Sequence, residues 1–139
     1  MMRDNQLVVP IRFIKEADID MAKITVVRGH QFDAPDDKRL ILALEDAGVD
    51  ILHRCGGLAR CTTCRVMFQI GEPQRMTVAE KEKLIEGGNL GRFRLSCQIV
   101  CDHDMTVEPM LSKKGENLDD AGPRPTDHIT PMAEWTQKP

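Results

Sequence analysis

The sequence predicts a small α+β domain in which helices pack on a mixed β-sheet. Three observations lead to this fold class. The chain has 139 residues, which is enough for one domain with a core and too few for two. Apolar residues make up 41 % of it, an ordinary share for a globular protein. Strand and helix patterns follow one another in the order strand–strand–helix–strand–helix–strand, which is typical of such a domain.

The first three predicted elements are two strands and a helix. Residues 22–29 are expected to form a strand because they are rich in β-branched side chains and close on a glycine. Residues 31–35 predict a short second strand that runs into a turn. Asp36 or Asp37 then offers a side chain that can cap a helix. An apolar stretch follows, and Gly48 is expected to end the helix.

The next two elements come after a loop that contains three cysteines. Alternation over residues 64–71 predicts a strand that ends at a turn. Thr77 is the predicted N-cap of a second helix over residues 78–85, and Glu80 occupies the capping-box position. Two glycines follow this segment and are expected to end the helix.

The last two predicted strands are residues 92–100 and 105–109, which a polar turn connects. Residues 22–111 are therefore the expected domain. Residues 1–21 are expected to be an N-terminal extension. Residues 112–139 contain four prolines, many polar residues and no apolar period, so a disordered C-terminal tail is expected there.

Composition excludes several classes of function. The formal net charge of −3 argues against nucleic acid as a partner. No apolar run approaches the roughly 20 residues that span a bilayer, so no membrane insertion is expected. The longest apolar stretch near the N-terminus is interrupted by Pro10 and does not resemble a secretory signal. We therefore expect a soluble cytoplasmic protein, and we expect it to be a monomer.

Four of the five cysteines form the pattern that predicts chemistry. Cys55, Cys61 and Cys64 form a C-x5-C-x2-C run, and Cys97 follows at a distance. Thiolates are the ligands of iron–sulfur clusters, and four of them complete two tetrahedral irons bridged by sulfides. A compact loop that supplies three ligands, with a distant fourth, predicts a cluster near the surface of a folded domain.

The residues around these cysteines suit a cluster-binding loop. Gly56 and Gly57 allow backbone conformations with positive φ, so that backbone N–H groups can turn toward the sulfurs. Such donors stabilise the negative charge that reduction adds to a cluster. Arg54, Arg60 and Arg65 flank the loop, and their positive charge is expected to raise the reduction potential.

The cysteine loop, together with the later segment Arg94-Leu95-Ser96-Cys97-Gln98-Ile99, resembles the plant-type and vertebrate-type [2Fe–2S] ferredoxins over residues 22–111. The five residues between the first two cysteines are more similar to the adrenodoxin-like and iron–sulfur-assembly members. The resemblance implies a β-grasp fold and one [2Fe–2S] cluster. The implied ligands are Cys55 and Cys61 for the outer iron, and Cys64 and Cys97 for the inner iron.

Two alternatives concern the fifth cysteine. Cys101 would give a ligand spacing closer to that of adrenodoxin-like members, but the Leu-Ser-Cys-Gln context favours Cys97. Cys101 is then expected to be a small buried apolar residue. A zinc site made of Cys61, Cys64, Cys97 and Cys101 is also possible, although it leaves Cys55 and the glycines of the loop unexplained.

The chain contains no recognisable catalytic apparatus. We find no Ser–His–Asp set, no paired catalytic carboxylates and no nucleotide-binding motif. The resemblance implies an electron-transfer protein and not an enzyme: a soluble one-electron carrier between a ferredoxin reductase and electron-accepting redox enzymes. The alternative is a redox-sensing or iron–sulfur assembly module, and the additional residues 112–139 are the feature that favours it.

Overall fold

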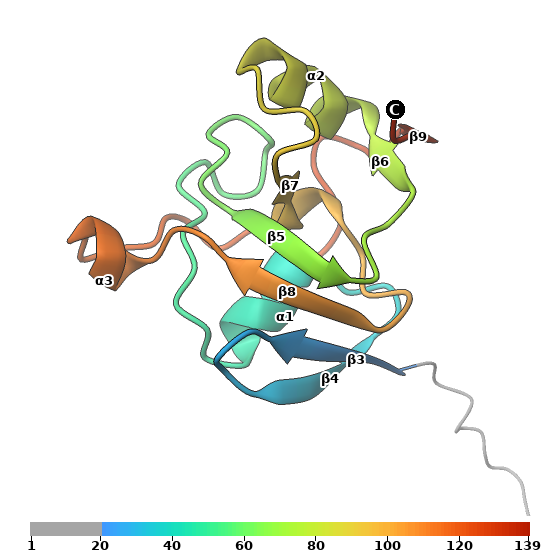
Figure 1. Cartoon of the computed structure of the whole chain (residues 1–139). Helices are drawn as coiled ribbons and strands as arrows, with labels where there is room; N and C mark the ends of the chain where they lie inside the picture. The colour runs from blue at the N-terminus through green and yellow to red at the C-terminus, as the bar shows by residue number, and fades with distance from the viewer. Residues whose placement is uncertain (1–20) are drawn as a thin grey trace, which may run out of the picture.

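A mixed five-stranded sheet forms the centre of the computed structural model, which describes residues 21–139 (Figure 1). The elements are β3 (Met21–Val26), β4 (Gln31–Pro35), α1 (Leu40–Asp46), β5 (Arg65–Ile70), β6 (Arg75–Thr77), α2 (Val78–Glu86), β7 (Arg94–Leu95), the 3₁₀ helix η2 (Ser96–Gln98), β8 (Met105–Pro109), α3 (Lys113–Glu116) and β9 (Trp135–Gln137). The strand order is β4-β3-β8-β5-β7, and β6 pairs separately with β9. β3 and β8 are parallel, whereas the other neighbours in the sheet are antiparallel. The predicted α+β class with a mixed sheet is confirmed.

Helix α1 covers one face of this sheet (Figure 1). Its buried side chains are Leu40, Ile41, Leu42, Ala43 and Leu44. They belong to one core with Ile24, Val66 and Val107 of the central strands. Full burial of one such aliphatic side chain stabilises a fold by about 1.5–3 kcal/mol. The core therefore fixes the sheet and α1 as the frame on which the cysteine loop rests.

The start of α1 differs from the prediction. Neither Asp36 nor Asp37 caps the helix, because the N-cap position is Arg39 and its side chain makes no capping hydrogen bond. The N–H of Leu40 instead donates to the carbonyl of Ile99, at 2.8 Å. A distant segment thus supplies the acceptor that a capping side chain usually provides. The side chain of Arg39 is consequently free to make other contacts.

The predicted strand over residues 92–100 is wrong for most of its length. Only β7 is a strand, and the chain then turns into η2. The N–H of Leu95 donates to a carboxylate oxygen of Glu80 at 2.8 Å, and the N–H of Ser96 donates to the carbonyl of Cys64 at 3.2 Å. Glu80 was expected to close a capping box with Thr77, but its carboxylate points toward β7 instead. The predicted N-cap itself is confirmed, since Thr77 accepts a hydrogen bond from the N–H of Glu80.

Residues 112–139 lie on the domain, whereas the sequence predicted a disordered tail. The segment contains α3 and β9, and β9 pairs antiparallel with β6. The guanidinium of Arg75 stacks on the ring of Trp135, with 3.8 Å between its carbon and the ring centroid. A tail composition indicates disorder when the segment is considered alone, but here the domain provides the hydrogen-bond partners. The predicted N-terminal extension, residues 1–21, lies outside the described residues except for Met21.

Residues 120–131, called here the C-terminal strap, pass beside the cysteine loop. Their contacts are mostly made through main-chain carbonyls, which any residue type carries. The carbonyls of Ala121, Pro123, Thr126, His128 and Thr130 all accept hydrogen bonds from the domain. At the outer surface of the strap, Arg124 forms an ion pair with Asp46 of α1 at 2.8 Å. The strap is therefore bound at several points along its length.

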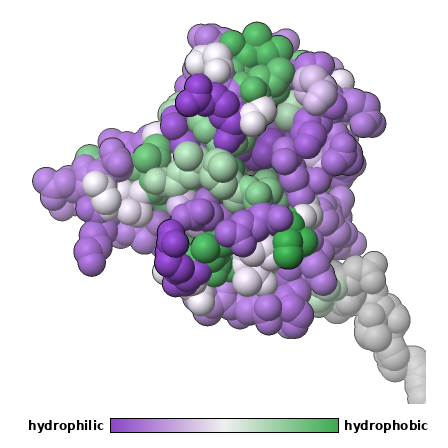
Figure 2. Space-filling model, in the orientation of Figure 1, coloured by the Kyte–Doolittle hydropathy of each residue, from purple (hydrophilic) through white to green (hydrophobic). Residues whose placement is uncertain are grey.

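Hydrophilic residues cover most of the surface seen in Figure 2, and apolar residues appear there as separate patches. Exposed apolar side chains include Met67 and Ile70 on β5. Within residues 21–139, no helix is long and apolar enough to cross a membrane.

His103 is expected to make the fold more stable at mildly acidic pH. Burial opposes its protonation, but hydrogen bonds to the Gly71 carbonyl (2.6 Å) and to Asp102 (2.7 Å), with the nearby charge of Asp104, raise its pKa above the ordinary value of 6.5. This stabilisation is fully present below pH 6.5 and is lost as the pH rises through the higher pKa of the folded state. The stabilisation by His103 can be measured by thermal unfolding of wild type and His103→Asn from about pH 5.5 to about pH 8.5.

The difference in melting temperature between these two proteins should shrink as the pH rises. In the Asp102→Asn background the pH dependence should be weaker, because the carboxylate that faces His103 is gone. A difference that is constant across the range, or that grows with pH, contradicts the prediction.

Candidate metal centre

The cysteine loop connects α1 to β5 by a series of tight turns. Gly56 and Gly57 have φ angles of +73° and +85°, as their positions in the motif predicted. Ala59 and Thr62 also adopt positive φ, at 59° and 56°, which the sequence did not indicate. A non-glycine residue in this region costs about 1–2 kcal/mol. The loop therefore depends on contacts with the rest of the domain for its conformation.

Cys55 and Cys61 form the first pair of cysteines, at the half-buried edge of the loop. Their side chains are hydrogen-bonded to each other. Two backbone N–H groups, of Leu58 at 3.3 Å and of Arg60 at 3.4 Å, point to the sulfur of Cys55. The bond with Cys61, assisted by these donors, lowers the pKa of the Cys55 thiol to about 4, against the effect of burial. The same bond, together with burial, raises the pKa of Cys61.

The sulfur of Cys61 also lies among donors. The N–H groups of Cys55 at 3.3 Å and Thr63 at 3.5 Å point to it, and the hydroxyl of Thr63 is 2.9 Å away. The prediction that the loop turns backbone N–H groups toward its cysteines is confirmed. Such an arrangement stabilises negative charge on sulfur, which a metal ligand carries.

Cys64 and Cys97 form the second pair, and both are almost fully buried, at 3 % and 1 % exposure. The N–H of Cys97 lies 3.4 Å from the sulfur of Cys64, and the side chains of the two are hydrogen-bonded to each other. This contact lowers the pKa of Cys97 and, together with burial, raises that of Cys64. The side-chain amide of Gln98 also points to the Cys97 sulfur, at 3.7 Å. A residue distant in the sequence thus reaches the loop, as the motif required.

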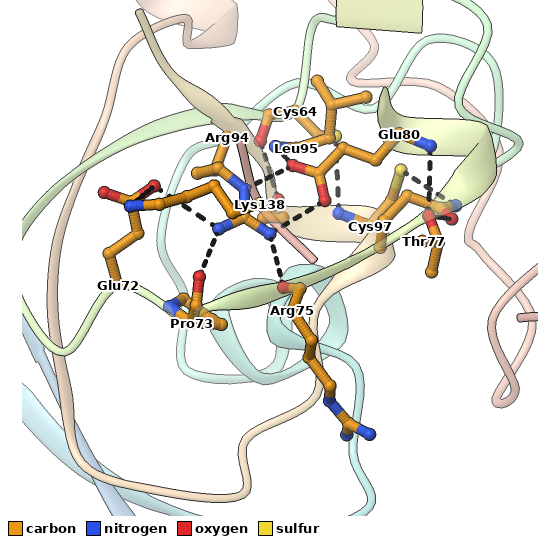
Figure 3. A network of polar contacts seen from close by, with 12 residues as sticks. Cys64, Glu72, Pro73, Arg75, Thr77, Glu80, Arg94, Leu95, Cys97 and Lys138 are labelled. Atoms are coloured by element: carbon orange, nitrogen blue, oxygen red, sulfur yellow. Dashed lines mark hydrogen bonds and ion pairs between the residues drawn. The ribbon is translucent and has the colours of Figure 1, made fainter. Parts of the chain in front are cut away.

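A buried polar network determines where Cys97 lies (Figure 3). Glu80, which is 0 % exposed, accepts two hydrogen bonds from Arg94 at 2.7 and 3.1 Å and one from the N–H of Leu95. The hydroxyl of Thr77 donates to the side-chain carbonyl of Gln98 at 2.7 Å. Both contacts run from the N-terminus of α2 to the segment that carries Cys97. The sequence pattern did not assign these roles to Glu80 and Thr77.

The four motif cysteines are therefore arranged as two neighbouring pairs, which suits a group containing two metal ions. A single tetrahedral zinc needs four donors around one point. Cys101, the fourth donor of the zinc alternative, is fully buried, its N–H donates to the Lys38 carbonyl, and burial raises the pKa of its thiol to about 12. Two thiol pairs with N–H donors fit a four-thiolate [2Fe–2S] site.

The arginines that flank the loop have different environments. Arg60 is exposed. Arg54 is exposed and donates to the carbonyl of Asp120 in the strap, at 2.7 Å. Arg65 donates to both oxygens of Thr62 and lies over the ring of Phe93. Two of the three are thus held by other residues, and each adds positive charge around the loop.

Arg39 is the residue at the site that the sequence analysis missed. It is 0 % exposed, and its guanidinium donates to the carbonyls of Cys97 and Gly57. A Cβ atom at Gly57 would lie 2.6 Å from an Arg39 nitrogen, which leaves no space for a side chain there. Arg39 follows two aspartates and precedes an apolar helix, and arginines are mostly exposed in proteins. No local signal in the sequence therefore indicated that it is buried.

Comparison with known proteins gives a consistent result. The sequence profile of the 2Fe-2S iron-sulfur cluster binding domain matches residues 24–102, more than half of the chain. A 2Fe-2S ferredoxin of Haemophilus influenzae is 34 % identical over 84 residues, which cover 58 % of this chain and 74 % of that protein. One subunit of the Na(+)-translocating NADH-quinone reductase of Chlamydia muridarum is 37 % identical over 76 residues. This match covers 51 % of the chain, which spans only 16 % of the length of that subunit.

The fold has counterparts among solved structures. An ISC-like [2Fe-2S] ferredoxin from Pseudomonas putida superposes with a TM-score of 0.50 and 24 % sequence identity. The match covers 66 % of this chain and 95 % of that protein. The ferredoxin-like fold expected from the sequence is therefore confirmed.

Proposed function

Because the chain belongs to the family of 2Fe-2S iron–sulfur cluster binding domains, we propose that it is a one-electron carrier. We further propose that Cys55, Cys61, Cys64 and Cys97 are the cluster ligands. The single observation that carries the proposal is the arrangement of these cysteines in two pairs, with backbone N–H groups directed at three of the four sulfurs. When bound, the cluster accepts and returns one electron at a time.

The two pairs have different tasks in this proposal. Cys64 and Cys97 bind the inner iron, where burial excludes water from the site. Cys55 and Cys61 are half-buried and bind the outer iron. The exposed residues Leu58 and Arg60 lie between them in the sequence, so a redox partner can approach the loop at this edge. The N–H donors at Cys55 and Cys61 stabilise the added negative charge without any rearrangement of the loop.

The partners follow from this role. We propose that a ferredoxin reductase supplies the electrons and that electron-accepting redox enzymes receive them. The protein then transfers electrons and catalyses no reaction on a substrate of its own. We also propose that it acts as a monomer in the cytoplasm. Residues 22–111 form the cluster-binding domain in this proposal, and residues 112–139 stabilise it from outside.

Low-temperature EPR spectroscopy of the anaerobically purified protein tests the proposal. The oxidised sample should be silent, and reduction with dithionite should produce an S = ½ signal of about one spin per chain. The reduced protein should also pass electrons from a ferredoxin reductase to cytochrome c, whereas the cluster-free protein should not. A sample that stays silent in both states and contains zinc would show that the proposal is wrong.

A further inference from the structure

The side chain of Arg39 is completely buried and fully hydrogen-bonded. Its Nε and one Nη2 hydrogen donate to the carbonyl of Cys97, at 3.0 and 2.7 Å, and Nη2 also donates to the carbonyl of Gly57 at 2.6 Å. Nη1 donates to the carbonyls of Thr126 and His128 in the strap, at 2.9 and 3.1 Å. A guanidinium has five N–H donors, and these five contacts use all of them. One side chain thus joins the fourth ligand, the cysteine loop and the strap.

All of these acceptors are neutral carbonyls. Among residues 21–139, no carboxylate lies within ion-pair distance of Arg39. An arginine remains protonated in proteins, so the site contains a buried positive charge without a carboxylate partner. Desolvation by burial opposes the charge of the guanidinium, and thiolates at Cys97, Cys64 and Cys55, as they are when they bind a metal, favour it. The anionic partner of this cation is therefore the cysteine site itself.

We propose that Arg39 favours the reduced state of the cluster through its buried positive charge. This inference rests on the proposed function. Reduction by one electron adds one negative charge at the four cysteines, and a fixed cation that is screened from water stabilises it. The carbonyl contacts hold the guanidinium in place in both redox states, so no reorganisation is needed when the electron arrives. The contact with the strap keeps water away from the guanidinium and so preserves the effect.

Burial distinguishes Arg39 from the arginines that the sequence analysis emphasised. Arg60 belongs to the cysteine loop, but its side chain is exposed. Salt weakens the interactions of an exposed charge beyond a screening length of about 10 Å at 0.1 M ionic strength. It weakens the interactions of a buried charge much less. The contributions of Arg39 and Arg60 to the reduction potential can therefore be separated by their dependence on salt.

The experiment is a spectroelectrochemical titration of wild type, Arg39→Gln and Arg60→Gln, each normalised to its cluster content, at about 0.05 M and about 0.5 M salt. In Arg39→Gln the equilibrium constant for reduction should fall about tenfold, which corresponds to a reduction potential lower by about 59 mV. This decrease should be the same at both salt concentrations. Arg60→Gln should show a smaller decrease that nearly disappears at the higher salt concentration. An Arg39→Gln potential equal to that of wild type, or a shift that salt abolishes, would overturn the inference.

Arg39→Lys provides a second test, which also applies if Arg39→Gln does not assemble a cluster. Lysine keeps the charge but has three donors instead of five, so it loosens the strap while leaving a cation at the site. The equilibrium constant for reduction of Arg39→Lys should then stay within about threefold of the wild-type value. A tenfold or larger fall in Arg39→Lys would contradict a role of the charge. If wild type itself shows no one-electron step, the proposed function fails, whatever the variants do.

Discussion

Replacement of Cys97 by alanine is expected to abolish cluster binding. Cys97 lies in the buried pair, 1 % exposed, and its removal leaves three thiolates where two tetrahedral irons require four. The purified variant should lack the visible absorption of an iron–sulfur protein, and reduction should produce no EPR signal. Iron and sulfide analysis should give a small fraction of the wild-type content per chain.

Cys101→Ala is the matched control. Cys101 is equally buried, burial raises the pKa of its thiol to about 12, and its N–H donates to the Lys38 carbonyl. This variant should keep the full EPR signal and lose about 1 kcal/mol of stability. If Cys101→Ala instead loses the cluster while Cys97→Ala retains it, the fourth ligand is Cys101 and the pairing described above is wrong.

Glu80→Ala is expected to be the most destabilising substitution outside the ligands. It removes the carboxylate that pairs with buried Arg94 and accepts the N–H of Leu95. Loss of one partner of a buried ion pair costs up to about 3–5 kcal/mol, and Arg94 would keep only the more exposed carboxylate of Glu72, 3.4 Å from its Nη1. Denaturant unfolding under anaerobic conditions, followed by circular dichroism, should show a strongly lowered midpoint. Loss of cluster absorption should occur at a lower denaturant concentration as well, since β7 leads into Cys97.

Glu82→Gln is the control on the same helix, because Glu82 is exposed. Its effect on stability should be within about 0.5 kcal/mol. The double variant Glu80→Leu/Arg94→Met should recover part of the loss, since apolar side chains leave no uncompensated charge in the interior. An unfolding midpoint of Glu80→Ala close to that of Glu82→Gln would show that the buried pair of Glu80 and Arg94 does not stabilise the segment that carries Cys97.

Several features were predictable because they depend on neighbours in the sequence. β-branched runs and alternation located β3, β4, β5 and β8, and the glycines after α1 and α2 located the ends of these two helices. Thr77 was predictable as a cap because its partner is three residues away. Gly56 and Gly57 predicted two positive φ angles of the cysteine loop for the same reason, whereas those of Ala59 and Thr62 were not indicated. These signals act within one turn or one strand, where residue type decides conformation.

Other features depended on contacts between distant segments. Glu80 satisfied the pattern of a capping box, yet its carboxylate pairs with Arg94, fourteen residues later. The N-cap of α1 was mispredicted because the carbonyl of Ile99 takes the place of a capping side chain. The composition of residues 112–139 predicted disorder, and it gave no sign of the bonds that hold the strap, because these use main-chain carbonyls. Every residue has a main-chain carbonyl, so the sequence does not indicate which carbonyls accept hydrogen bonds from distant residues.

Residue identity and spacing were enough to predict an α+β domain and to propose four of its cysteines as the ligands of a [2Fe–2S] cluster. The ligand types, the glycines between them and the order of the main strands can all be read along the chain. The pairing of the cysteines, the contact by which Glu80 holds the segment of Cys97, and the burial of Arg39 beside the loop became visible only in the folded molecule. The reason is physical: whether a charged side chain is buried depends on acceptors that the fold brings from distant positions, and residue type alone does not specify them.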